Sequence, residues 1–152
     1  MTNIVLVGFK RSPFTIANKG LLASVRPEDI LSQVINDLIK TTNINKDDIE
    51  DIIAGCAYPE GAQGYTIAKI VSFMTGMPEH VGGMTINRWC GSSMQAIHSA
   101  AGAISMNAGR VFVCCGIESM TSVPINGLNY SPHPELLNCL LYTSDAADET
   151  CR

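Results

Sequence analysis

The sequence has little charge and no cluster of basic residues. Ten Lys and Arg residues stand against fourteen Asp and Glu residues, so the formal net charge is −4 and the pI is near 5.2. Because binding to nucleic acid depends on grouped cations that neutralise phosphates, this balance argues against nucleic acid as a partner. A composition that is 46% hydrophobic and 16% charged also excludes a disordered chain.

The sequence also lacks a long apolar run. Its longest uncharged stretch, Trp89–Gly109, is interrupted by serines, Gln95, His98 and Asn107, which makes it too polar to span a bilayer. Near the N-terminus, basic residues follow the apolar segment Ile4–Phe9, whereas in a signal peptide they precede it. We therefore expect a cytoplasmic protein with no membrane partner.

No Cys-x-x-Cys pair and no histidine pair at metal-binding spacing is present, which argues against a zinc site. Without a secretory segment, the six cysteines are expected to be reduced thiols. We interpret Cys56, Cys114 and Cys115 as small core residues, the last two pointing to opposite faces of one strand.

The order of apolar segments indicates an α/β fold. Ile4–Phe9 is a nearly continuous apolar run, typical of a strand buried on both faces. Pro27 begins a helix with one apolar stripe. Further strands are expected at 51–57, 83–87 and 111–116, and further helices at 67–74 and 91–108. The resulting βαβαβαβ order predicts a mostly parallel sheet with helices on both faces.

The helix expected after Cys90 carries no charge on any face and is rich in small residues. Such a helix is typically buried all round, so it needs a second covering layer that this chain does not obviously supply. His98 lies within it and is expected to be a hydrogen-bonded structural residue.

Cys90 lies where a predicted strand ends and this helix begins. Helix N-termini present unpaired N–H groups and a positive dipole, which favour the nucleophilic thiolate form of a cysteine. Gly91 allows close approach of a ligand, and Ser92 or Ser93 can form local hydrogen bonds. Position alone leaves two interpretations open, a catalytic nucleophile or one more buried cysteine.

The segment around Cys90, Ile86–Ile97, closely resembles the nucleophilic-cysteine signature of the thiolases. Three further segments resemble motifs of that family in the correct order, with Ser12, Thr66, Lys69 and Cys115 as departures: Lys10–Phe14, Gln63–Lys69 and Cys115–Met120. The sequence that begins at Cys90, together with Asn129 and Tyr130, is most similar to the degradative 3-ketoacyl-CoA thiolases of fatty-acid β-oxidation. The resemblance covers about residues 3–138.

The resemblance implies that Cys90 attacks the 3-keto carbon of a 3-ketoacyl-CoA and carries the acyl group until a second CoA removes it. It implies coenzyme A as co-substrate, no bound cofactor, no metal, and a homo-oligomer, dimer or tetramer, at full length. The family's histidine in Gly-His-Pro and its second cysteine in Cys-x-Gly-x-Gly do not occur in the sequence, and His80, His98 and His133 match neither. We therefore expect a fragment that is inactive alone, with CoA-binding residues unassigned.

Three regions are expected along the chain: a thiolase-like N-terminal α/β core at 1–120, the start of a loop region at 121–138, and a tail at 139–152. Residues 139–149 have no counterpart in the family and resemble translated sequencing-adapter DNA. We interpret this tail as non-native and exclude it from the fold.

Alternative functions remain open at this point. A condensing ketoacyl synthase shares the strand–cysteine–helix arrangement, but its flanking residues differ from Asn87-Arg88-Trp89. A biosynthetic acetoacetyl-CoA thiolase shares the signature itself. A non-catalytic fragment that associates with other chains is the alternative from another class.

Overall fold

The computed structural model describes residues 3–134. The elements in this range are α1 (Pro27–Thr42), a 3-10 turn (Lys46–Asp48), β1 (Asp51–Gly55), a second 3-10 turn (Gly61–Gln63), α2 (Ile67–Met74), β2 (Gly82–Ile86), α3 (Ser92–Ser105) and β3 (Phe112–Gly116). The interpreted tail, 139–152, lies outside the described residues.

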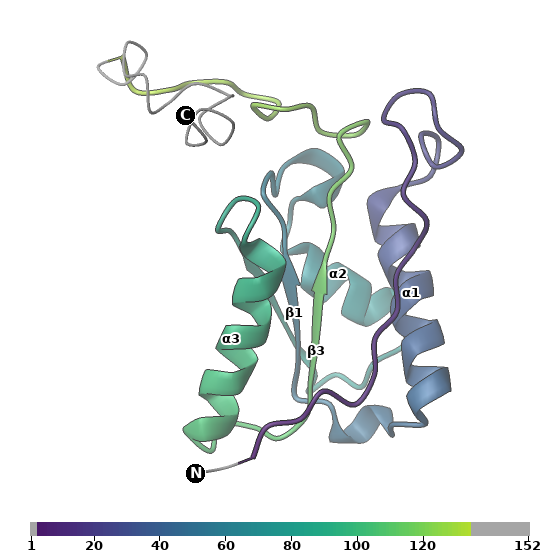
Figure 1. The fold of residues 1–152 in the computed structure, drawn as a ribbon, viewed down its shortest axis with the longest axis vertical. Helices are drawn as coiled ribbons and strands as arrows, with labels where there is room; N and C mark the ends of the chain where they lie inside the picture. The colour runs from purple at the N-terminus through teal and green to yellow at the C-terminus, as the bar shows by residue number, and fades with distance from the viewer. Residues whose placement is uncertain (1–2, 135–152) are drawn as a thin grey trace, which may run out of the picture.

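The three strands form one parallel sheet in the order β2-β1-β3. Helices α1 and α2 lie on one face and α3 lies on the other (Figure 1). Alternate residues of β1 point to opposite faces: Ile52 and Ala54 pack toward α1 and α2, and Ile53 packs toward α3. The predicted α/β class, with parallel strands and helices on both faces, is confirmed.

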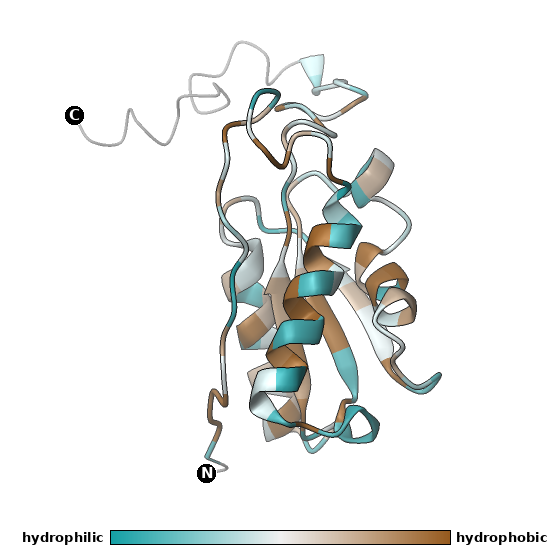
Figure 2. Ribbon diagram, turned by 90° about the vertical axis from the view of Figure 1, so that its right-hand side faces the viewer, coloured by the Kyte–Doolittle hydropathy of each residue, from teal (hydrophilic) through white to brown (hydrophobic). Residues whose placement is uncertain are grey.

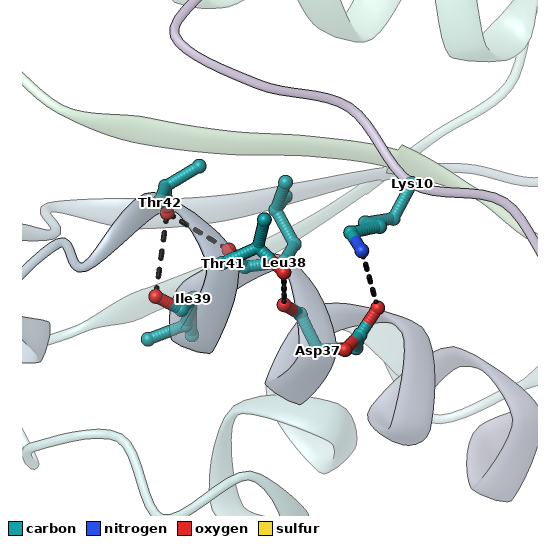
Figure 3. A network of polar contacts seen from close by, with 6 residues as sticks. All are labelled: Lys10, Asp37, Leu38, Ile39, Thr41 and Thr42. Carbon is teal, nitrogen blue, oxygen red and sulfur yellow. Dashed lines mark hydrogen bonds and ion pairs between the residues drawn. The ribbon is translucent and has the colours of Figure 1, made fainter.

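The first helix is amphipathic, as its spacing predicts. Figure 2 shows α1 with a brown apolar stripe and a teal polar face. Leu31 and Ile35 are buried in the core, and Pro27 occupies the first turn together with the acidic Glu28 and Asp29. At the other end of α1, the hydroxyls of Thr41 and Thr42 donate to carbonyls one turn back (Figure 3).

The prediction of a strand at Ile4–Phe9 is wrong. This segment pairs with no strand in the described part of the chain, and Leu6 and Phe9 are 81% and 92% exposed. It runs beside α1 instead, where Lys10 Nζ lies 2.7 Å from Asp37 Oδ2 (Figures 1 and 3). An apolar run alone does not make a strand, because a strand needs a paired neighbour, and within residues 3–134 this segment pairs with none.

Helix α3 is buried only on the side that faces the sheet. It places Ser92, Ala96 and Ala100 against the sheet, while Met94 and Ile97 on its other side are exposed. Among the described residues no second layer covers the outer face of α3, as expected for a chain that does not itself supply the layer this uncharged helix needs. Within the same range, no helix is long and apolar enough to cross a membrane.

Candidate active site

Cys90 lies in the short loop that joins β2 to α3, at the edge where all three parallel strands end. The thiol is free and the residue is exposed. Two hydrogen bonds close the loop into a turn: Gly91 N–H donates to the Arg88 carbonyl at 3.0 Å, and Ser92 N–H donates to the Trp89 carbonyl at 3.0 Å. Cys90 is therefore presented outward, directly before the first turn of α3.

Side chains on both sides of Cys90 hold the loop. Ser92 Oγ accepts from Arg88 N–H at 2.8 Å and donates to the Trp89 carbonyl at 2.6 Å. Asn87 Oδ1 accepts from Trp89 N–H at 2.9 Å, which helps to fix the left-handed backbone of Trp89 (φ 48°). Of the two serines that could bond locally, Ser92 is the one that holds the loop.

The loop approaches the sheet closely because two strands end in glycine. A β-carbon on Gly55 would lie 2.4 Å from the Ser92 carbonyl carbon and from Ser93 N. A β-carbon on Gly116 would lie 1.9 Å from Ser93 Oγ. Larger residues at these two strand ends would displace the start of α3, and Cys90 with it.

A carboxylate lies behind the loop. Glu118, two residues after β3, accepts from Ala57 N–H at 2.7 Å and from Gln63 Nε2 at 2.8 Å. On the other side of residue 57, Asn87 Nδ2 donates to the Ala57 carbonyl at 2.8 Å. The thiolase-like segments that contain Asn87, Gln63 and Glu118 are thus brought together, a set of contacts that spacing along the sequence does not reveal.

The other described cysteines are buried or half-buried. Burial raises the pKa of the Cys56 thiol to about 12, and the Glu118 carboxylate adds to the shift. Burial likewise raises the pKa of Cys115 to about 12, and it raises the pKa of Cys114, with a smaller effect from Asp51. Cys114 packs toward α3 and Cys115 toward α1 and α2, as predicted. These thiols stay protonated at neutral pH, which suits core residues and not nucleophiles.

The histidines lie elsewhere. His80 precedes β2, at the end of that strand opposite to Cys90, and His98 is exposed on α3. The expectation that His98 lies inside a buried helix is therefore wrong. His133 lies in the segment after residue 121 and is also exposed. Among residues 3–134, no group of three His, Cys, Asp or Glu side chains could hold a metal ion.

A cavity of about 290 Å³ opens between the N-terminal segment and α1. Its lining includes Lys10, Arg11, Pro13, Leu22, Val34 and Asp37. It contains no residue of the Cys90 loop, so the candidate nucleophile and the cavity are separate features.

Comparisons with known proteins agree with these observations. The chain is 37% identical over 134 residues to a 3-ketoacyl-CoA thiolase of Aeromonas salmonicida, covering 87% of this chain and 35% of that protein. It is 37% identical over 140 residues to a 3-ketoacyl-CoA thiolase of Shewanella frigidimarina, covering 91% and 36%. The chain thus spans about a third of the length of the curated relatives that it matches.

The fold agrees with a solved structure as well. The crystal structure of the Bacillus anthracis acetyl-CoA acetyltransferase superposes with a TM-score of 0.64 at 31% identity, over 68% of this chain and 26% of that one. Residues 4–136, which include β1–β3, the Cys90 loop and the Glu118 segment, match the family model described as the thiolase N-terminal domain, and the chain therefore belongs to the thiolase family.

Proposed function

We propose that this chain is the acyl-accepting part of an acyltransferase that cleaves 3-ketoacyl-CoA with CoA, in the degradative direction of fatty-acid β-oxidation. The observation that carries the proposal is the exposed Cys90 on a loop fixed by Ser92 and Asn87 at the carboxyl edge of a parallel sheet. The names of the relatives at 37% identity support the substrate class. A cytoplasmic location is part of the same proposal.

In the proposed reaction, the Cys90 thiolate attacks C3 of the 3-ketoacyl-CoA and forms a tetrahedral alkoxide. The C2–C3 bond then breaks, which leaves an acyl thioester on Cys90 and the enolate of acetyl-CoA, and the enolate takes up a proton. A second CoA thiol loses its proton, attacks the thioester and leaves as acyl-CoA, so that Cys90 is a thiolate again. The Cys90 backbone N–H is proposed as one donor to the developing oxyanion.

The proton transfers of this cycle need groups that the Cys90 loop does not provide. One base must activate the thiol, and one acid must protonate the enolate; each such group typically contributes about 10²–10⁴ in rate. This chain spans about a third of the length of its relatives, and we assign both groups to the part of the thiolase sequence that it does not span. The 152-residue chain alone is therefore proposed to accept an acyl group slowly and to catalyse no thiolysis.

A second candidate is biosynthetic condensation of two acetyl-CoA molecules. The likeness to an acetyl-CoA acetyltransferase favours it, and the Cys90 step is the same in both. The two candidates differ in acyl chain length and direction, which full-length proteins with the missing portion restored would separate by their relative rates on acetoacetyl-CoA and on longer 3-ketoacyl-CoA substrates.

The experiment that tests the proposal is acylation of the purified chain. We incubate it with acetyl-CoA and with a more reactive acetyl thioester, then map the modified peptide by mass spectrometry. Acetyl transfer to Cys90, and its absence in Cys90→Ser, is expected. Acylation of Cys56, Cys114 or Cys115 in place of Cys90 would show that the nucleophile is misassigned.

A further inference from the structure

Glu118 does not touch Cys90, yet its two oxygens bind groups from segments about sixty residues earlier in the chain. Oε2 accepts from Ala57 N–H at 2.7 Å, and Oε1 accepts from Gln63 Nε2 at 2.8 Å. An exposed carboxylate with two such acceptor contacts is more constrained than a solvated surface charge. We propose that Glu118 is a positioning residue, which sets the conformation of the Cys90 loop through residue 57 and Trp89.

The first path from Glu118 to the loop is a chain of hydrogen bonds. Glu118 holds the N–H of Ala57, and Asn87 Nδ2 holds the carbonyl of the same residue at 2.8 Å. The other end of the Asn87 amide, Oδ1, accepts from Trp89 N–H at 2.9 Å. The Glu118 carboxylate and the Asn87 amide therefore hydrogen-bond to the N–H and the carbonyl of Ala57. The Asn87 amide also hydrogen-bonds to Trp89, the residue directly before Cys90, and so links the position of Ala57 to that of Trp89.

The second path runs through a buried amide and an aromatic pair. Gln63 is fully buried, and its Nε2 donates to Glu118 and also to the Tyr58 carbonyl at 2.8 Å. Gln63 Oε1 accepts from Ser119 N–H, which fixes the orientation of the amide. The ring of Tyr58 meets the ring of Trp89 edge-on, with centroids 5.4 Å apart and planes at 82°. Both paths thus meet at Trp89.

The position requires two acceptors. Both oxygens of Glu118 accept, whereas a glutamine offers one acceptor and one NH₂ group, so Glu118→Gln must lose one of the two contacts. The variant has nearly the same shape and breaks a path without opening a cavity. Its effect should therefore appear in the conformation of the loop. The inference deepens the proposed function, because it rests on Cys90 being the acyl acceptor there.

Trp89 provides a readout that does not depend on any reaction, because it is the single tryptophan of the sequence. In Glu118→Gln we expect lower fluorescence anisotropy, stronger quenching by acrylamide and a red-shifted emission, because Trp89 loses its support. Glu60→Gln is the matched control, since the Glu60 carboxylate also accepts a backbone N–H, that of Leu128 at 2.7 Å, but its side chain lies on neither path. It should leave all three signals at their wild-type values.

The second readout compares two reactions of Cys90. Acetyl transfer from a thioester requires alignment with an oxyanion donor and should slow about tenfold in Glu118→Gln, the equivalent of one lost charge-assisted hydrogen bond. Alkylation by iodoacetamide requires an exposed thiol and should stay within about twofold, since Cys90 is exposed already. A purely structural role for Glu118 would change both reactions together.

Each outcome is decisive. Unchanged Trp89 fluorescence in a folded Glu118→Gln chain overturns the inference, whatever Cys90 does. Failure of the wild-type chain to take up an acetyl group on Cys90 overturns the proposed function, while the Trp89 signals still decide the role of Glu118. If Glu118→Gln loses its helical circular dichroism, Asn87→Asp replaces it, because this change keeps the contact to Trp89 N–H and removes the one to Ala57. The same Trp89 signature is then expected, and wild-type fluorescence in Asn87→Asp overturns the inference.

Discussion

The two faces of the sheet are covered to different extents. On the α1 and α2 face, the buried cluster among the described residues is Leu31, Ile35, Ile49, Ile52, Ala54, Ile67, Ala68, Val71, Met77, Val81 and Val113. On the α3 face, it is Ile53, Ala96 and Ala100. The first face holds most of the apolar burial that stabilises the fold, whereas the second brings a helix of small residues close enough to carry Cys90 to the strand ends.

The largest difference in stability is expected between two variants that each truncate one isoleucine, one on each face of the sheet. Ile35 in α1 is 1% exposed and Ile97 in α3 is 42% exposed. Ile35→Ala should lower the free energy of unfolding by about 3–4 kcal/mol, and Ile97→Ala by less than about 1 kcal/mol, because the second leaves no cavity. Urea unfolding followed by circular dichroism measures both, and equal losses would contradict the contrast between the faces.

A smaller effect is expected from adding one methyl group where α3 meets the sheet. Gly55→Ala should cost about 1–3 kcal/mol, because its new β-carbon meets backbone atoms of Ser92 and Ser93 that cannot rotate away. Gly102→Ala is the matched control in the C-terminal half of α3, where nothing lies within 4 Å of the new carbon. It should stabilise the chain by about 0.5–1 kcal/mol. Thermal unfolding should therefore shift in opposite directions for the two variants.

The pH dependence of stability tests the burial of Cys56. Burial raises the pKa of this thiol to about 12 from an ordinary value of 9.0, so above pH 9 the unfolded chain releases a proton that the folded chain keeps. Stability is thus unaffected below pH 9 and is lost as pH rises toward 12, with a slope approaching about 1.4 kcal/mol per pH unit. Unfolding of the chain and of Cys56→Ala should differ by that slope between pH 9.5 and 11. Parallel curves would mean that Cys56 is accessible to solvent.

The smallest effect is expected at the N-terminal segment. The Lys10–Asp37 pair is partly exposed on both sides, so Lys10→Met should change the free energy of unfolding by less than about 1 kcal/mol, and less again in high salt. The same urea titrations at two ionic strengths measure this. A loss as large as that of Ile35→Ala would show that the segment belongs to the core.

The helices and the three strands of the sheet could be predicted from the sequence because each has a local signal. The stripe of α1 and the apolar run before Cys56 depend on neighbours in sequence, and both are found where expected. The segment Ile4–Phe9 has an equally clear signal, but whether a strand pairs depends on a partner that the segment itself does not encode.

The candidate site divides in the same way. Cys90 could be found from its motif and from its place before a helix. The hydrogen bonds of Asn87 and Glu118 to Ala57 could not be predicted, since they depend on β2 and β3 both ending beside β1. Hydrogen bonds between residues 30 and 61 positions apart require the register of the sheet, which no local pattern carries.

The two side-chain hydrogen bonds to Ala57 also differ in when they can form. Asn87 lies 30 residues after Ala57, and Glu118 lies 61 residues after it, so a chain made from its N-terminus presents the amide before the carboxylate. Closing the longer loop costs more chain entropy. The pairing of β3 with β1 closes such a loop, because β2 and α3 lie between the two strands in the sequence. We therefore expect the Cys90 loop to acquire its final shape late in folding, and pulsed hydrogen exchange should show protection of Ala57 N–H lagging behind that of the β1–β2 amides.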